Sequence, residues 1–308
     1  MATTGPDTDS GTWANNYTSA EISGDAKHPL SAQDHAVQFP YSIGGRQFFY
    51  GQNLLTRSWY TRELLAGGKM GVEKATGFWG HAYKIQFPFT IGGRVFFYGQ
   101  DQGTKRWFIQ ELLPDGRMGS ETANGSWNNA YGVQFTFTVG GRVFLYGQNL
   151  QTAYWFIQEL LPNGKMGPET ANGRWNNAYA VQFPFTIGDR AFFYGQNQAT
   201  AYWFIQELLP DGKMGSETAN GTWNNAYAVQ FPFTIGDRTF LYGQNQATAY
   251  WFIQELLPYG KMGSETDNGH WSKAYHIQFP FSIGGEVFYY GLNVKTSSWF
   301  IQPFIQRL

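Results

Sequence analysis

The sequence predicts an all-β fold, a six-bladed β-propeller made of 48-residue repeats with four strands each. Three observations predict it: a strict repeat, the residue types within each copy, and a detached fragment of the repeat at the N-terminus. No insertion or deletion separates one copy from the next, and the copies begin at Val37, Ile85, Val133, Val181, Val229 and Ile277. Repeats of about 40 to 50 residues with strand-like content are typical of propellers and related arrays.

Composition supports many short strands and excludes several kinds of site. Aromatic residues make up 19% of the chain and charged residues 14%, with 38 Gly and 13 Pro, which suits strands joined by tight turns. The net charge of −1 and the lack of any Lys/Arg run argue against nucleic acid as a partner. The chain has no Cys, and its five His occupy unrelated positions in the repeats. We therefore expect no metal site and no cofactor.

The first residues, MATTGPDTDSGTW, lack the basic start and apolar core of a signal peptide. No run of about 18 apolar residues exists, so we expect no transmembrane segment. The expected localisation is cytoplasmic as synthesised, with non-classical release left open.

The fourth copy shows the expected strands most clearly. The segments 181–187, 190–196, 201–209 and 213–223 read as four strands, separated by Gly188-Asp189, a loop, and the turn Pro210-Asp211-Gly212. Bulky residues alternate on both faces of the third strand, as expected for a sheet that packs between two neighbours. One tryptophan set lies in this strand, and we assign it to core packing: Trp59, Trp107, Trp155, Trp203, Trp251 and Trp299.

The N-terminus contains the part of the repeat that the last copy lacks. Residues 8–17 (TDSGTWANNY) resemble residues 218–227 (TANGTWNNAY), whereas the last copy stops at Leu308 after WFIQPFIQRL. This layout indicates a closed ring whose last blade is completed by the N-terminal strand. A β-solenoid is the alternative, and it would not need the permuted terminus. We expect one domain over residues 1–308, with a closing strand at 1–17, a loop at 18–36, and repeats at 37–84, 85–132, 133–180, 181–228, 229–276 and 277–308.

No motif of a known enzyme class is present. The chain lacks a Gly-rich phosphate loop, a GxSxG elbow and an HExxH helix. Catalytic sites are built once from unlike residues, whereas the polar residues of this chain recur. We therefore predict no catalytic residues and no enzyme activity.

A second tryptophan set is the candidate binding element. Each member follows a Gly-containing turn, and several precede Asn-Asn-Ala-Tyr: Trp13, Trp79, Trp127, Trp175, Trp223 and Trp271. An exposed indole beside amides suits sugar recognition, because the C–H face of a pyranose stacks on the ring while amides bind the hydroxyls. The alternative is that these tryptophans fill the gap between blades.

Polar residues near these tryptophans complete the candidate site. Paired amides can donate and accept, as hydroxyls require: Asn128, Asn129, Asn176, Asn177, Asn224 and Asn225. The first and fifth copies have Gly80-His81 and Ser272-Lys273 there, so we expect weak pockets in them. Glu121, Glu169 and Glu217 could orient a hydroxyl pair, and a turn-stabilising or solvated carboxylate is the alternative.

Two other repeated residues are assigned to structure. An Arg follows the first turn in five copies, and a Glu lies in the third strand of the same copies; in the sixth copy they become Glu286 and Pro303. Their joint loss favours an intramolecular pair over an acidic-sugar site. The Gln of the Tyr-Gly-Gln motif becomes Leu292 in that copy, which favours a half-buried hydrogen-bonding role.

A ring of short, aromatic-rich repeats with a recurring Trp, no Cys and a terminus that completes the last blade resembles the β-propeller lectins of the tectonin and tachylectin kind. The resemblance covers the whole chain at the level of architecture. It implies a multivalent agglutinin that binds glycans of glycoproteins or glycolipids in repeated pockets, in defence or host interaction.

The alternative function classes are a sialidase-like hydrolase and a protein-interaction ring. Ser216 to Trp223 (SETANGTW) is close to the Ser-x-Asp-x-Gly-x-Thr-Trp turn of sialidases, but the Asp is absent and the Gly is one residue too near the Trp. The other class is a protein-interaction ring. Near-identical turns in the third and fourth repeats favour a small repeated ligand over a protein partner.

Overall fold

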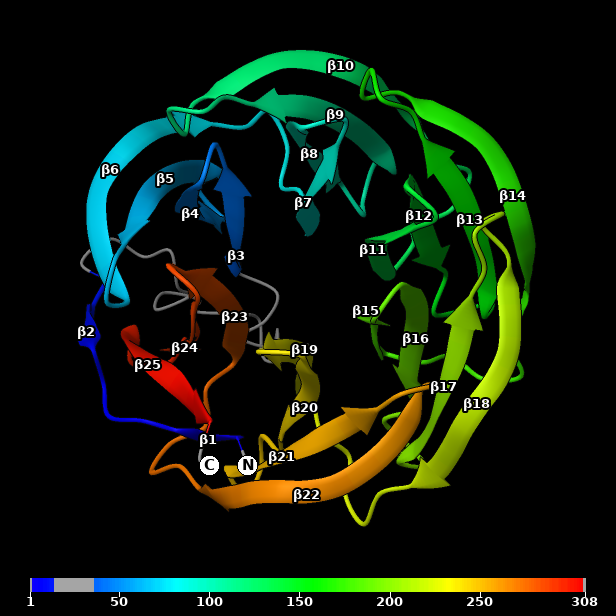
Figure 1. The fold of residues 1–308 in the computed structure, drawn as a ribbon. Helices are drawn as coiled ribbons and strands as arrows, with labels where there is room; N and C mark the ends of the chain where they lie inside the picture. The colour runs from blue at the N-terminus through cyan, green and yellow to red at the C-terminus, as the bar shows by residue number, and fades with distance from the viewer. Residues whose placement is uncertain (1, 14–35, 307–308) are drawn as a thin grey trace, which may run out of the picture.

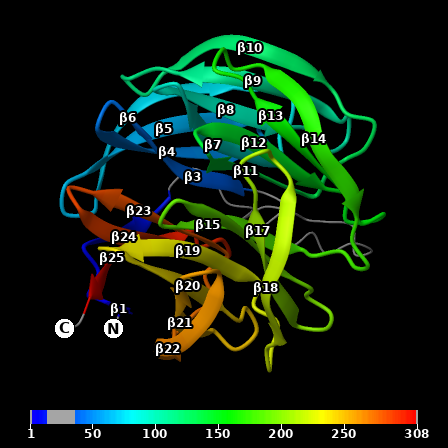
Figure 2. The ribbon, with the colours of Figure 1, turned by 45° about the vertical axis from the view of Figure 1, so that its right-hand side comes forward.

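The computed structural model describes residues 2–13 and 36–306, and within them every regular element is a β-strand. Six antiparallel sheets stand around a central axis, as the predicted propeller requires (Figure 1). Blades 1 to 5 have four strands each, in sequence order from the centre to the rim. Figure 2 shows the rim strands β14 and β18 lying outside β13 and β17.

The innermost strands are β3 (Ala36–Ile43), β7 (Ile85–Ile91), β11 (Val133–Val139), β15 (Val181–Ile187), β19 (Val229–Ile235) and β23 (Ile277–Ile283). The second strands are β4 (Arg46–Asn53), β8 (Arg94–Gln100), β12 (Arg142–Gln148), β16 (Arg190–Gln196), β20 (Arg238–Gln244) and β24 (Glu286–Asn293). The third strands are β5 (Ser58–Leu65), β9 (Arg106–Leu112), β13 (Tyr154–Leu160), β17 (Tyr202–Leu208), β21 (Tyr250–Leu257) and β25 (Ser298–Gln306). The rim strands of blades 1 to 5 are β6 (Lys69–Phe78), β10 (Met118–Ser126), β14 (Met166–Arg174), β18 (Met214–Thr222) and β22 (Lys261–His270).

The rim of blade 6 comes from the N-terminus, which confirms the predicted closure. Strands β1 (Ala2–Thr4) and β2 (Asp9–Thr12) both pair antiparallel with β25 (Figure 1). Asp9 lies opposite Ile301, and Thr4 lies opposite Phe304. Residues 1 and 14–17 of the predicted closing strand and the predicted loop at 18–36 lie outside the described residues, except for residue 36, which begins β3.

Turn residues set where each strand ends. In blade 4, Gly188 (φ 63°) closes a two-residue hairpin between β15 and β16. Between β16 and β17, Oδ1 of Asn197 accepts the N–H groups of Ala199 and Thr200 at 2.9 and 3.1 Å. Gly212 (φ 74°) follows Pro210-Asp211 in the next turn. The strands therefore end within about one residue of their predicted limits.

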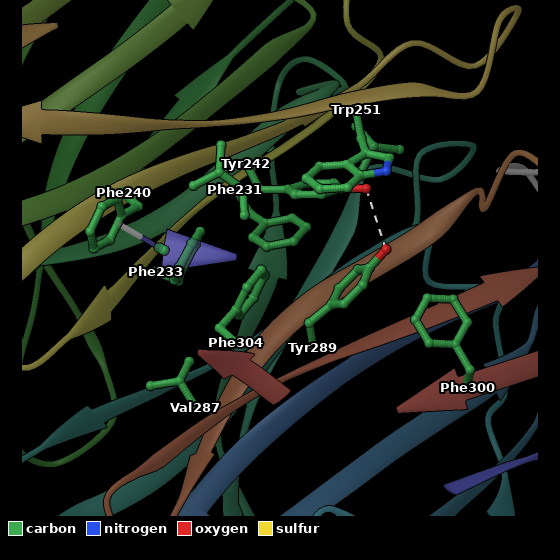
Figure 3. Close-up of a cluster of buried hydrophobic side chains, with 12 residues drawn as sticks. Phe231, Phe233, Phe240, Tyr242, Trp251, Val287, Tyr289, Phe300 and Phe304 are labelled. Carbon is green, nitrogen blue, oxygen red and sulfur yellow. Dashed lines mark hydrogen bonds between the residues drawn. The ribbon is translucent and has the colours of Figure 1, made fainter. Parts of the chain in front are cut away.

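Each sheet buries both faces against its neighbours, which explains the bulky residues on both sides of the strands. Figure 3 shows this packing between blades 5 and 6. The rings of Phe233 and Phe304 stack at 3.9 Å, and the hydroxyls of Tyr242 and Tyr289 lie 3.3 Å apart (Figure 3). Clusters of the same kind join every pair of adjacent blades.

The tryptophans of the third strands pack as predicted. Trp59, Trp203 and Trp251 are buried, and their three counterparts are half-buried against the same clusters. In blade 4, Trp203 lies directly across from Gly221, where a Cβ atom would come 2.8 Å from the indole ring. The glycine before the second tryptophan set is therefore a packing requirement.

The repeated Arg and Glu residues form one ion pair within each of blades 1 to 5, which confirms the intramolecular assignment. The pairs, with N–O distances of 2.6 to 2.7 Å, are Arg46–Glu63, Arg94–Glu111, Arg142–Glu159, Arg190–Glu207 and Arg238–Glu255.

The Gln of the Tyr-Gly-Gln motif is fully buried, deeper than predicted. Its side-chain oxygen accepts a hydrogen bond from a Gln on the innermost strand of the next blade. Gln86 donates to Gln52 in this way, and Gln134 donates to Gln100. These amides link neighbouring blades near the axis.

Candidate functional site

The second tryptophan set lies between blades, with its N–H groups already paired. Nε1 of Trp127 donates to the Tyr98 hydroxyl at 2.9 Å, and the same bond recurs in all six blades. The Trp127 ring packs 5.1 Å from Phe156 of the next blade. Five of these indoles are half-buried, and Trp13 is 9% exposed. They fill the gap between blades, and their stacking on a sugar stays a prediction.

A pocket opens where the loop after one rim strand passes over the next blade, and its lining includes the third-strand Trp107 but no tryptophan of the second set. Between blades 1 and 2 it has a volume of about 460 Å³. It is lined by His81 and Tyr83 of the loop and by seven residues of β9 and β10: Arg106, Trp107, Phe108, Glu121, Asn124, Gly125 and Ser126.

A related constellation, with an Asn in place of His81 and a second Tyr in place of Arg106, occurs at the next three blade boundaries. Between blades 2 and 3, Asn129 contacts the Tyr131 hydroxyl, and both Tyr154 and Glu169 lie close enough to affect that hydroxyl. Burial is the main cause that raises the pKa of Tyr131, and the charges of these two groups raise it further. The equivalent groups between blades 3 and 4 are Asn177, Tyr179, Tyr202 and Glu217, and those between blades 4 and 5 are Asn225, Tyr227, Tyr250 and Glu265.

An Asn three residues after each Glu fixes the carboxylate. Nδ2 of Asn172 donates to Oε1 of Glu169 at 2.5 Å, and Asn268 donates to Glu265 at 2.6 Å. Blades 2 and 4 repeat the bond with Asn124–Glu121 and Asn220–Glu217. Within the described part of the chain, Oε2 of Glu169 has no hydrogen-bond partner. A carboxylate held in this way is oriented to accept from a ligand hydroxyl.

The structure brings together predicted residues from different repeats. Asn129 and Glu169 of the following repeat both lie near the Tyr131 hydroxyl, and Glu121 lines a pocket together with His81 of the preceding repeat. The first Asn of each pair is placed differently: at Asn128 the backbone oxygen accepts from Nζ of Lys105 at 3.0 Å. Nothing in the described contacts brings the side chains of Asn128, Asn176 or Asn224 into the pocket.

Sequence reasoning missed the tyrosines at the mouth of each pocket and the Asn that holds the Glu. The missed residues are Tyr131, Tyr154, Asn172 and their counterparts. Their signal was present, because Asn-Asn-Ala-Tyr and Ala-Asn-Gly recur with the repeat, but the sequence does not say that the two motifs of neighbouring repeats meet.

The unusual loop of the first copy has a local explanation. In blade 3, Nδ2 of Asn149 donates a hydrogen bond to the loop carbonyl of Ala130 at 3.0 Å. In blade 2 an Asp replaces this Asn, and Oδ2 of Asp101 lies 3.2 Å from Nδ1 of His81. The contact between Asp101 and His81 thus takes the place of the bond between the Asn and the loop carbonyl. The pocket between blades 1 and 2 is present with these two residues.

Among residues 2–13 and 36–306, no three His, Cys, Asp or Glu side chains gather as metal ligands would. In the same ranges, no helix is long and apolar enough to cross a membrane.

Comparisons with known proteins give the fold and no family. The sequence matches no protein family, and no curated protein is similar to it. A structure provisionally named as a 6-phosphogluconolactonase of Bacteroides fragilis aligns over 92% of this chain and 89% of its own, at 12% identity and a TM-score of 0.55. A Bacteroides uniformis structure named in the same way covers 91% and 87%, at 13% identity and a TM-score of 0.56. An exo-β-1,3-galactanase of Phanerochaete chrysosporium, with β-1,3-galactotriose, covers 85% and 65%, at 10% identity and a TM-score of 0.52.

The prediction of no enzyme activity is wrong as an inference from this fold. Proteins with the same architecture are named as enzymes, a lactonase and a galactanase. Missing sequence motifs therefore do not exclude catalysis on such a ring. At these identities the likeness carries the fold alone.

Proposed function

We propose that the chain binds glycans through the repeated pockets between its blades. The observation that carries this proposal is the constellation of two tyrosines, one loop Asn and one Asn-held Glu, which recurs at three successive blade boundaries. Between blades 1 and 2 the pocket volume lies within the range of about 300–1,000 Å³ of small-molecule sites.

Each group of the constellation suits one part of a saccharide. The tyrosine rings offer apolar faces to sugar C–H groups, and the hydroxyls and amides both donate and accept. The carboxylate of Glu169 accepts from a sugar hydroxyl in a charge-assisted bond. In this proposal Trp127, Trp175 and Trp223 hold the tyrosine and phenylalanine rings in place from beneath.

Repetition would turn weak single sites into a useful surface. Several sites on one rigid ring raise the apparent affinity for a cell surface by orders of magnitude. Terminal sugars of glycoproteins or glycolipids are the partners that this arrangement would bind, and agglutination would follow.

The test is a glycan array with the full chain, followed by competition with free monosaccharide. We then expect the triple variant E169Q/E217Q/E265Q to lose about tenfold or more in affinity at these pockets, because hydrogen bonds to a charged group contribute about 1.5–3 kcal/mol. The matched control is E286Q, which removes an exposed carboxylate from the first residue of β24 on blade 6. Mass spectrometry of the bound oligosaccharide would show any cleavage in the same experiment.

Folded protein that binds nothing on the array would count against glycans and favour a protein partner. Binding that the triple variant leaves unchanged would place the glycan site elsewhere on the ring.

A further inference from the structure

Four blade boundaries share a loop Tyr and a rim-strand Glu, and one cross-strand pair beside these groups differs from blade to blade. We infer that this pair selects the ligand of each pocket: pockets with an Arg in the pair take acidic saccharides, and the pocket with Tyr202 and Thr222 takes neutral ones. This inference rests on the proposed function.

The pair has the same register in every blade. It joins the first residue of the third strand to a residue at the end of the rim strand. The six pairs are Ser58–Phe78, Arg106–Ser126, Tyr154–Arg174, Tyr202–Thr222, Tyr250–His270 and Ser298–Thr12. The next pair along each sheet is Trp opposite Gly in all six blades. The backbone is therefore constant where the side chains vary.

The pair lies in the pocket wall, beside the constant groups. Arg106 and Ser126 both line the cavity between blades 1 and 2, together with Tyr83, Glu121 and Asn124. Because the register repeats, the pairs of blades 3 to 5 hold the equivalent position, with Tyr154, Tyr202 and Tyr250 close to the loop tyrosines.

The two arginines in these pairs are available to a ligand. Arg106 and Arg174 are exposed, and neither forms an ion pair with any residue that the structure describes. By contrast, Arg142 binds Glu159 through two nitrogens, at 2.7 and 2.8 Å. A guanidinium fork without a carboxylate partner suits the carboxylate of a sugar acid, which it can bind with two parallel hydrogen bonds.

The constant Glu sets the orientation of such a ligand. Glu121 repels a carboxylate and accepts hydroxyl hydrogens, so the acidic group must lie on the Arg106 side and the ring hydroxyls on the Glu121 and Asn124 side. A simple anion without hydroxyl groups would bind the arginine and leave Glu121 and Asn124 without a partner in the ligand. A saccharide with a carboxylate on one side of its ring can bind the arginine and these two residues.

The other pairs give each wall its own character. His270 lies with its ring 5.2 Å from Tyr250, and Phe78 is 78% exposed on blade 1. Only the pair of Tyr202 and Thr222 combines the full constellation with two uncharged residues that cannot become cationic, so it is the neutral reference.

The test uses the full chain and two free oligosaccharides that differ only at the terminal C6, one ending in galactose and the other in galacturonic acid. R106Y/R174T gives both walls the uncharged character of the reference pocket. We expect it to weaken binding of the acid about tenfold or more and to change binding of the neutral sugar less than twofold, because the paired charged hydrogen bonds are lost. Calorimetry reports affinity and the number of sites for each sugar.

The reciprocal variant T222R should add one site for the acid. It copies the side chain that blade 3 carries at Arg174, so the fold already accommodates it. R117Q is the matched control, since Arg117 is exposed in a turn and pairs with Asp115, away from the pocket. Melting temperatures check that all variants are folded.

The outcomes separate this inference from the proposed function. The inference alone would be overturned if the protein binds the neutral sugar but neither R106Y/R174T nor T222R changes the binding of the acidic sugar. Binding of neither sugar, nor of any other glycan on the array, by folded wild-type protein would overturn both.

Discussion

Six non-glycine residues support the loops around the pockets in a left-handed backbone conformation. They immediately precede the third strand of each blade: Arg57, Lys105, Ala153, Ala201, Ala249 and Ser297, with φ between 55° and 63°. In blade 4 the Ala201 carbonyl accepts the N–H of Trp223 at 3.1 Å, and the same bond recurs in the other blades. This conformation costs a residue with a Cβ atom about 1–2 kcal/mol. The turn therefore stores strain beside the candidate site.

Replacing Ala201 by Gly should relieve this strain. We expect Ala201→Gly to raise the free energy of unfolding by about 0.5 kcal/mol, because the relief of roughly 1–2 kcal/mol exceeds the cost of about 0.4–1 kcal/mol from the freer unfolded chain. Urea unfolding measures the change. Ala199→Gly in the same turn is the control, since its φ is ordinary and only the entropic cost applies. Equal destabilisation by both substitutions would show that position 201 stores no strain.

At the scale of an element, the N-terminal strands join the first and last blades as well as completing a sheet. Oδ2 of Asp9 accepts the N–H of Met70 in blade 1 at 2.9 Å, and Thr8 donates its hydroxyl to the Gly68 carbonyl at 3.1 Å. Trp13 is buried with Phe49 and Tyr60 of blade 1. Without this segment, the edge of β25 and an aromatic surface of blade 1 would be exposed.

Removal of residues 1–13 should therefore open the ring. We expect a lower melting temperature and self-association through the bare edge of β25, because an unpaired edge strand pairs with other chains. Light scattering and thermal unfolding measure both effects. A synthetic peptide of residues 2–13 should restore the melting temperature, and a scrambled peptide should not. A truncated chain that stays monomeric with an unchanged melting temperature would contradict this role.

At the scale of the whole molecule, repetition multiplies small effects, and the five Arg–Glu pairs are an example. The hydrogen bond from Arg46 lowers the pKa of Glu63 to about 2, and the pKa values of Glu111, Glu159 and Glu207 are lowered for the same reason. A carboxylate whose pKa is lower in the folded state stabilises that state fully above its unfolded pKa, and this contribution disappears as the pH falls through the folded pKa.

The pairs should therefore make the ring sensitive to acid between about pH 4.5 and pH 2. We expect the melting temperature of the wild-type chain to fall across this window. The fall should be smaller in E111Q/E159Q/E207Q, which cannot lose those protons. E286Q serves as the control, because blade 6 lacks the pair. Identical pH profiles for wild type and the triple variant would contradict a stabilising role for the pairs.

The sequence was informative about the fold because the same turn residues recur at a fixed spacing. Gly188, the Pro210-Asp211-Gly212 turn and the detached fragment at 8–17 were enough to place the strands and the closure. The site was harder to predict, because the loop after each rim strand passes over the next blade. Asn129 and Tyr131 therefore lie near Glu169 of the following repeat, an arrangement that only the geometry of the ring determines. Whether the chain is an enzyme could not be inferred from motifs, since a ring can assemble a site from several blades.

The pairing of β1 and β2 with β25 also has a consequence for the order of events during synthesis. Strands β1 and β2 are made before all six repeats and must wait for β25, so blade 6 cannot be completed until the sixth repeat has emerged. Contacts between such distant segments form slowly, because a long loop must close first. Blades 1 to 5 each consist of consecutive strands and can form in order while the chain grows. The nascent chain is thus an open arc for most of its synthesis, and its two unsealed ends are the surfaces that a chaperone would have to cover.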